Sequence, residues 1–210
     1  MSHDDVLARS SPLPSTRHEP LFVPKALTTV VVAALGICVL ANAALLVAQV
    51  RLHLATEGSY AAFESGMWVG NLTGLRLLAF LLTGIVFLRW LWQMRVNAEA
   101  LAPGGHRMKR GWTTGAWLIP IVCFFLPKRI INDIWAASSP PDRPRRTSGL
   151  LTSWWLLFVA AQLVAYPSPS QGPGSAEMTG AALYVAAGAL CIGVVRRLAS
   201  MQRARLRGGS

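Results

Sequence analysis

The sequence predicts an all-α integral membrane protein with four transmembrane helices, a proline-broken segment that re-enters the membrane or lies at its interface, and a cytoplasmic amphipathic helix. The chain of 210 residues is 53% hydrophobic and only 14% charged. Its apolar residues form long runs, and its lysines and arginines lie beside these runs, as in polytopic membrane proteins. Membrane orientation and anionic lipid therefore account for the net charge of +11, and we do not expect nucleic acid as a partner.

Four apolar stretches predict the transmembrane helices, at residues 26–50, 74–92, 149–166 and 179–195. The first contains no charged residue and would form a helix of about 37 Å at about 1.5 Å per residue, long enough to cross with some tilt. A signal-peptidase-like sequence lies at residues 41–43, but the apolar run continues beyond it. This continuation favours an uncleaved first span.

The ends and connections of the chain are polar. Residues 1–24 contain several prolines and predict a disordered cytoplasmic tail before a helical membrane domain, residues 25–196. Residues 51–70 are expected to form a polar connection, and the helix of the second span should continue past the bilayer until Pro103. In the last span, the small residues Gly180, Ala181, Gly188 and Gly193 would permit helices to approach closely. Residues 197–210 are expected to be a basic cytoplasmic tail.

A short apolar stretch, residues 111–127, decides the topology. As a helix it would reach about 25 Å, which is at the lower limit for crossing a hydrocarbon core of about 30 Å. Pro120 lacks the amide hydrogen that a crossing helix would use near its centre. We therefore expect the stretch to enter from the cytoplasm, turn near Pro120 and leave on the same side. A short kinked crossing is the alternative.

The distribution of basic residues favours re-entry. If the stretch returns to its starting side, all of the 20 lysines and arginines except Arg51 and Arg76 lie on the cytoplasmic side, as do both termini. A crossing would divide the basic residues almost evenly. Of the 8 tryptophans, all except Trp68 would lie near the cytoplasmic surface, as in a one-sided aromatic belt.

After residue 127 the pattern becomes amphipathic. Apolar side chains recur at helical spacing from Ile130 to Trp135, whereas the opposite face is polar and carries Lys128, Arg129, Asn132 and Asp133. This pattern fits either a helix at the membrane interface or a helix packed on its neighbours. Arg129 and Asp133 are four residues apart, so we expect them to form an ion pair.

The sequence shows no set of residues suited to catalysis. An enzyme would need a nucleophile with a base, a metal cluster or paired carboxylates. His53 and Glu57 are four residues apart but lack a third metal ligand. Asp133 beside Trp135 is the best chemical candidate, yet an ion-paired helix residue is the preferred interpretation. We therefore expect no enzyme, and no catalytic, cofactor-binding or metal-binding residues.

Several motifs add a family resemblance: Asn97-Ala98, Gly111-Trp112, Trp117, Ile119-Pro120-Ile121, Leu126-Pro127 and the run from Asp133 through Trp135 to Ser138. Over roughly residues 70–196, the chain resembles a family of actinobacterial membrane proteins known as domain of unknown function 4328. Members usually carry Asn three residues after the central proline, where this chain has Cys123. The resemblance implies a bacterial plasma membrane and no particular reaction. Its motif residues are Asn97, Gly111, Trp112, Trp117, Pro120, Pro127, Asp133 and Trp135.

Two classes of function stay open. The leading prediction is a non-enzymatic interaction or scaffold protein with a basic cytoplasmic face. Its expected partners are the lipid bilayer, anionic lipid headgroups, and either another protein or a second copy of the chain. The basic tail would meet lipid through Arg196, Arg197, Arg203, Arg205 and Arg207. The alternative is a small oligomeric transporter or channel in which the broken segment around Pro120 lines a path.

Overall fold

The computed structural model describes residues 23–140, 148–164 and 175–207, and within these ranges the chain is helical and has no strand. The predicted all-α class is therefore confirmed for this part of the chain. The elements in order are α2 (Lys25–Leu54), α3 (Tyr60–Leu101), α4 (Trp112–Gly115), the 3₁₀ helix η1 (Val122–Phe124), α5 (Leu126–Ser138), α6 (Gly149–Val164) and α7 (Ser175–Arg207).

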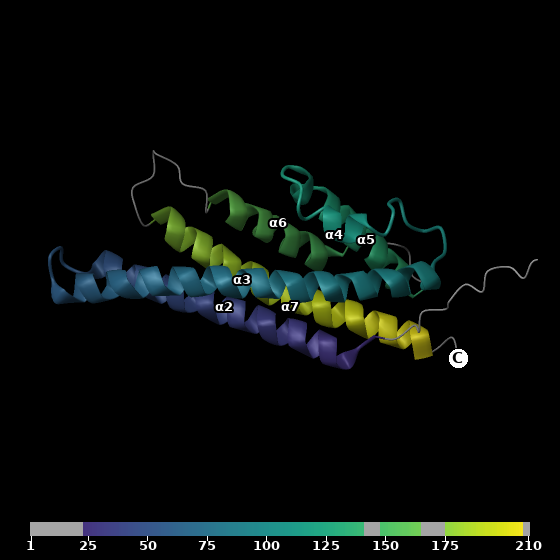
Figure 1. The fold of residues 1–210 in the computed structure, drawn as a ribbon, viewed down its shortest axis with the longest axis horizontal. Coiled ribbons are helices and arrows are strands. Elements are labelled where there is room, and N and C mark those ends of the chain that lie inside the picture. The colour runs from purple at the N-terminus through teal and green to yellow at the C-terminus, as the bar shows by residue number, and fades with distance from the viewer. Residues whose placement is uncertain (1–22, 141–147, 165–174, 208–210) are drawn as a thin grey trace, which may run out of the picture.

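Three long helices form the body of the molecule. In Figure 1, α2, α3 and α7 run side by side, and α2 packs against both of the others. All three are long and apolar enough to cross a membrane. Helix α6 packs along α7, but its 16 residues fall short of the roughly 20 that a spanning helix usually needs.

The first connection is much shorter than expected, because residues 51–70 are mostly helical rather than a polar loop. Helix α2 continues to Leu54, and α3 already begins at Tyr60. Gly58 supplies the positive φ of 75° in the intervening turn, and the Ser59 side chain accepts a hydrogen bond from the Ala62 amide at 3.2 Å, which caps α3. The predicted continuation of the second helix beyond residue 92 is confirmed, since α3 ends at Leu101.

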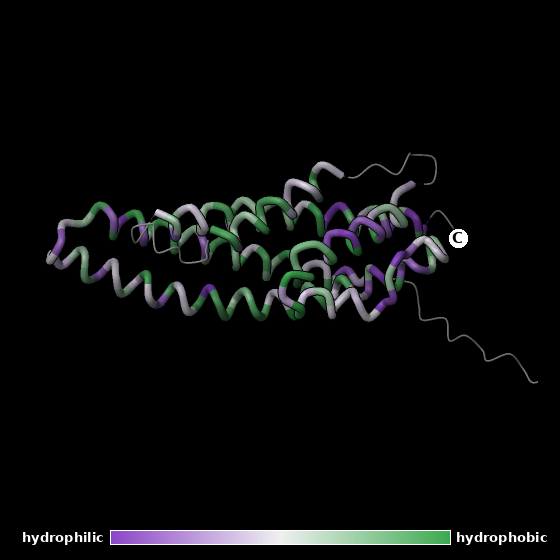
Figure 2. The backbone as a smooth tube through the Cα atoms, turned by 90° about the horizontal axis from the view of Figure 1, so that it is seen from above, coloured by the Kyte–Doolittle hydropathy of each residue, from purple (hydrophilic) through white to green (hydrophobic). Residues whose placement is uncertain are grey.

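The basic C-terminal segment also continues a helix instead of starting a separate tail at residue 197. Helix α7 runs to Arg207, and its last part buries Leu198, Ala199 and Gln202. This buried face packs the segment on the bundle, so the arginines around it are held on a helix surface. Figure 2 shows hydrophilic residues gathered at the end of the bundle where α7 ends and hydrophobic residues along the middle of the long helices. We call this end the basic end.

The chain between α3 and α6 folds back on itself. Arg107 precedes the apolar stretch and Asp133 follows it, yet the Arg107 amide donates to Asp133 Oδ2 at 3.4 Å. Between them the chain is broken into α4 and η1, and Ile121 adopts a positive φ of 69° directly after Pro120. The two flanks of the stretch therefore meet on one side of it.

Gly188 allows close packing of α7 on α2, as the small residues of this helix predict. A Cβ atom added at Gly188 would lie 2.5 Å from Val39 Cγ2, well inside van der Waals contact. Val39 is β-branched and therefore stiff, so it cannot readily rotate away. Gly193 faces α6 instead, at an ordinary 3.6 Å from Leu150 Cδ1.

We predict that Gly188→Leu separates α2 from α7 and lowers the free energy of unfolding by about 1–3 kcal/mol, the usual cost of overpacking. Thermal unfolding of the purified protein in detergent measures the effect. Gly84→Leu is the matched control, because a Cβ at Gly84 meets nothing within 4 Å. Equal destabilisation by both substitutions would contradict the close approach at Gly188.

Candidate functional site

Four polar side chains are fully enclosed at the basic end. Arg95 is 1% exposed, and Asn97, Ser138 and Gln202 are each 0% exposed. They come from α3, α5 and α7. Burying such groups costs free energy unless they are hydrogen-bonded, so their partners show what this end of the molecule is built to hold.

Gln202 joins three helices. Its Nε2 donates to the Met94 carbonyl oxygen at 2.8 Å and to Ser138 Oγ at 3.0 Å. Its Oε1 accepts from Asn97 Nδ2 at 3.0 Å, and Ser138 Oγ in turn donates to the Ile134 carbonyl oxygen at 2.7 Å. The amide thus fastens α7 to α3 and α5 in one register. We call these three side chains, Asn97, Ser138 and Gln202, the amide cluster.

A second group of charges ties the chain after α3 back onto that helix. Arg95 Nε donates to Glu99 Oε1 at 2.8 Å, and Arg95 Nη2 donates to the Met108 carbonyl oxygen at 2.6 Å. Arg110 donates to Glu99 Oε2 from both Nε and Nη2, at 2.9 and 2.6 Å. Glu99 lies on the polar end of α3, beyond the apolar stretch. Burial by itself would raise its pKa, but the hydrogen bonds from Arg110 and Arg95 outweigh burial and leave the pKa of Glu99 below its ordinary value.

Asp133 pairs with Arg107, and the expected pair with Arg129 is wrong. Arg107 Nε lies 4.0 Å from Asp133 Oδ1, and the Arg107 side chain is largely exposed. The connection after α3 passes over α5. It brings Arg107, which is distant in sequence, next to Asp133. An exposed pair of this kind contributes little stability, and its clear effect is to join the two flanks of the apolar stretch.

Aromatic rings hold the broken segment against α6 and α3. The ring of Trp117 packs edge-on against Phe87 and Trp155, with centroids 5.8 and 6.0 Å apart. Trp155 Nε1 also donates to the Phe124 carbonyl oxygen at 3.3 Å. This bond satisfies one backbone group that the irregular segment would otherwise leave without a partner.

The other motif residues have structural places. Gly111 precedes α4 and the exposed Trp112 begins it, whereas Pro120 lies at the exposed turn before Ile121. Pro127 is buried in the first turn of α5, where proline is well tolerated. The fold therefore brings Asn97 into the amide cluster and places Trp117 in the aromatic contacts, but it does not gather the motif into one site.

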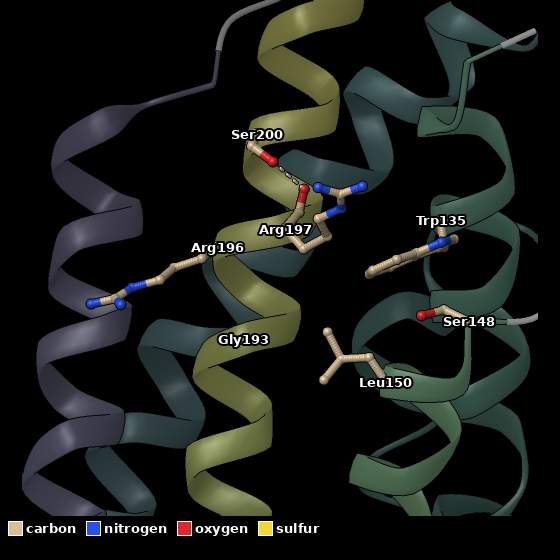
Figure 3. Close-up of a pocket in the computed structure, with 7 residues that line it drawn as sticks. All are labelled: Trp135, Ser148, Leu150, Gly193, Arg196, Arg197 and Ser200. Carbon is tan, nitrogen blue, oxygen red and sulfur yellow. Dashed lines mark hydrogen bonds between the residues drawn. The ribbon is translucent and has the colours of Figure 1, made fainter.

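An open groove of about 660 Å³ lies between α7 and the α5 and α6 helices. Its lining residues are Trp135, Ser148, Leu150, Gly193, Arg196, Arg197 and Ser200. In Figure 3 the Arg197 side chain points across the groove toward Trp135, whereas Arg196 points toward α2. We call this feature the α7 groove.

The remaining arginines of α7 lie beyond the groove. Arg205 donates from Nη2 to the Leu101 carbonyl oxygen at 3.4 Å, at the end of α3. Arg203 is half-buried and Arg207 is exposed. Only part of the predicted basic set is thus turned outward, and Arg205 also helps to close the end of α3.

Sequence reasoning did not identify Arg95, Glu99, Arg110 or Gln202 as a site. Arg95 and Glu99 lie at the polar end of a helix, Arg110 lies in the connection after it, and Gln202 lies in the basic C-terminal segment. The available signal was the spacing of Arg95 and Glu99, four apart on a helix that continues past its apolar stretch. Nothing in the local sequence marks Gln202, because its partners come from two distant helices.

We predict that Gln202→Leu lowers the free energy of unfolding by about 1–3 kcal/mol, because it removes the hydrogen bonds that the buried Asn97 Nδ2 and Ser138 Oγ atoms make with this amide. Thermal unfolding in detergent is the measurement. Gln49→Leu is a matched control with a smaller expected loss, since Gln49 makes a long 3.5 Å bond to Glu177. Adding Asn97→Leu to Gln202→Leu should cost less than the sum of the two single changes. Strict additivity would contradict direct coupling.

Comparison with known proteins supports the family resemblance. The model of a domain of unknown function, DUF4328, matches residues 54–200. No curated protein and no solved structure matches the chain. The matched range includes α3, the broken segment, α5, α6 and most of α7, and it ends two residues before Gln202. The chain belongs to the DUF4328 family.

Proposed function

We propose that the chain is a non-enzymatic membrane interaction protein whose basic end binds anionic lipid and docks an acidic partner. One observation carries this proposal. The buried polar groups of the basic end are engaged in holding helices together, whereas Lys109, Arg129, Arg196 and Arg197 are exposed on its surface. A rigid helical platform with outward positive charge suits recognition better than chemistry.

The proposed topology places the basic end on the cytoplasmic side of a bacterial plasma membrane, with both termini there. Helices α2, α3 and α7 would cross the bilayer, and the bias of basic residues supports the orientation. Leu150 lies beside Gly193, and Gln162 is hydrogen-bonded to Tyr184. Helix α6 therefore runs antiparallel to α7 along its apolar part, and we assign it as a fourth span. Local thinning of the bilayer accommodates a short helix at modest cost.

Residues 111–127 would re-enter rather than cross. The contact of Arg107 with Asp133 supports this arrangement, because both flanks of the stretch lie together. The packing of Trp117 on Phe87 places the stretch beside the apolar part of α3. The large exposed side chains Leu118, Ile121 and Phe125 suit contact with lipid. These outward side chains give little support to the alternative of a transporter path along the segment.

The topology is tested with a reporter that is active only in the cytoplasm, fused after Arg110, after Ser138 and after Ser210. We expect all three fusions to be active, because residues 111–127 return to the side from which they enter. A fusion after Thr56, in the turn between α2 and α3, is the control and should be inactive. An inactive fusion after Ser138 beside an active one after Arg110 would establish a crossing and overturn the proposed topology.

The binding role is tested with full-length protein extracted from bacterial membranes in polymer nanodiscs. We expect co-extracted lipid to be enriched in anionic headgroups relative to the bulk membrane. Changing Lys109 and Arg129 together to Gln should reduce the enrichment, since each basic residue near the surface contributes about 1 kcal/mol of attraction. Arg51→Gln, at the opposite end of α2, should leave it unchanged. Lipid identical to the bulk membrane in every variant would contradict the proposed role.

A further inference from the structure

The α7 groove has a polar part and an apolar part. Arg196, Arg197 and two serines, Ser148 and Ser200, line the polar part, and no acidic residue lines the groove. Trp135, Leu150 and Gly193 supply the apolar surface. Among the described residues, neither arginine forms an ion pair with an acidic side chain. The groove therefore offers unneutralised positive charge directly beside apolar surface.

The position of the groove along α7 matches a membrane interface. Arg196 and Arg197 immediately follow the apolar stretch of residues 179–195, and Gly193 lies one turn deeper. Trp135 faces Arg197 across the groove in Figure 3, and tryptophan is enriched at the level of lipid headgroups. Gly193 has no side chain, so it leaves room beside Leu150 where the apolar part begins.

We propose that the α7 groove binds one anionic phospholipid, with its phosphate at Arg197 and the start of its acyl chains against Leu150 and Gly193. Guanidinium groups form strong charge-assisted hydrogen bonds with phosphate oxygens. A volume of about 660 Å³ holds a headgroup and the first part of the chains, while the rest stays in the bilayer. This proposal rests on the orientation and role proposed above, and it adds a defined site to a general surface attraction.

A lipid fits this lining better than a soluble anion does. A soluble phosphate would use Arg197 alone and leave Trp135, Leu150 and Gly193 without a role. An amphiphile uses both parts, because burial of its chain adds hydrophobic free energy to the charge-assisted bonds. The same charge on an open helix surface would attract every anionic headgroup without holding one in place.

Native mass spectrometry of the full chain in detergent tests the site, with phosphatidylglycerol, phosphatidylcholine or soluble glycerol phosphate added. We expect one phosphatidylglycerol per chain, bound about tenfold more tightly than phosphatidylcholine, and weaker binding of glycerol phosphate. Arg197→Gln should weaken the binding of phosphatidylglycerol about tenfold, which is the effect of losing a charge-assisted hydrogen bond. Gly193→Leu should weaken the binding of all phospholipids, because the leucine side chain fills the apolar part of the groove. Thermal unfolding of each variant confirms that it is folded.

Arg203→Gln is the matched control, since it removes the same charge from α7 outside the groove. We expect it to change phosphatidylglycerol binding less than twofold, as a rough limit for a screened surface charge. If Arg203→Gln and Arg197→Gln weaken phosphatidylglycerol binding equally, the lipid site in the groove is contradicted. Binding to the general basic surface would then explain the result. Glycerol phosphate binding as tightly as the lipid would replace the lipid site with a soluble-anion site. No preference of the unchanged protein for phosphatidylglycerol would contradict both proposals.

Discussion

The arrangement of the basic end depends on the hydrogen bonds of one buried amide. Gln202 reaches the backbone of α3 through Met94, the side chain of α3 through Asn97, and α5 through Ser138. Each bond replaces water that is excluded at this position, so loss of one partner leaves another buried group unsatisfied. The amide cluster therefore fixes how α5 lies on the long helices. Because Trp135 belongs to α5, the cluster also sets one wall of the α7 groove.

The broken segment shows how irregular backbone is kept beside apolar surroundings. A chain that leaves regular helix exposes amide and carbonyl groups, and each is costly where water is scarce. Here short turns satisfy most of these groups locally, including the bond from the Cys123 amide to the Ile119 carbonyl oxygen at 3.0 Å. Trp155 from α6 supplies a bond to Phe124. The tight turn after Pro120 is thus stabilised by hydrogen bonds within the segment and by one hydrogen bond from α6.

Continuation of α7 changes the meaning of the C-terminal arginines. In a loose tail, all five would contribute equally to a diffuse positive charge. On a helix with a buried face, their directions differ: Arg197 points across the α7 groove, Arg196 points toward α2, and Arg205 reaches the end of α3. The same composition therefore produces both a general basic surface and one position where charge, an aromatic ring and apolar surface meet.

The sequence by itself determined the helical class, the apolar runs, the stop of α3 before Pro103, the breaking effect of Pro120 and the small residues of α7, because each follows from composition or local spacing. Tertiary structure decided the rest. Residues 51–70 became helix since a five-residue turn, residues 55–59, sufficed to connect α2 and α3. Asp133 forms its ion pair with Arg107 rather than Arg129, and Gln202 forms hydrogen bonds with residues of two distant helices. Hydrogen-bond partners and grooves depend on which helices become neighbours, and local sequence does not contain that information.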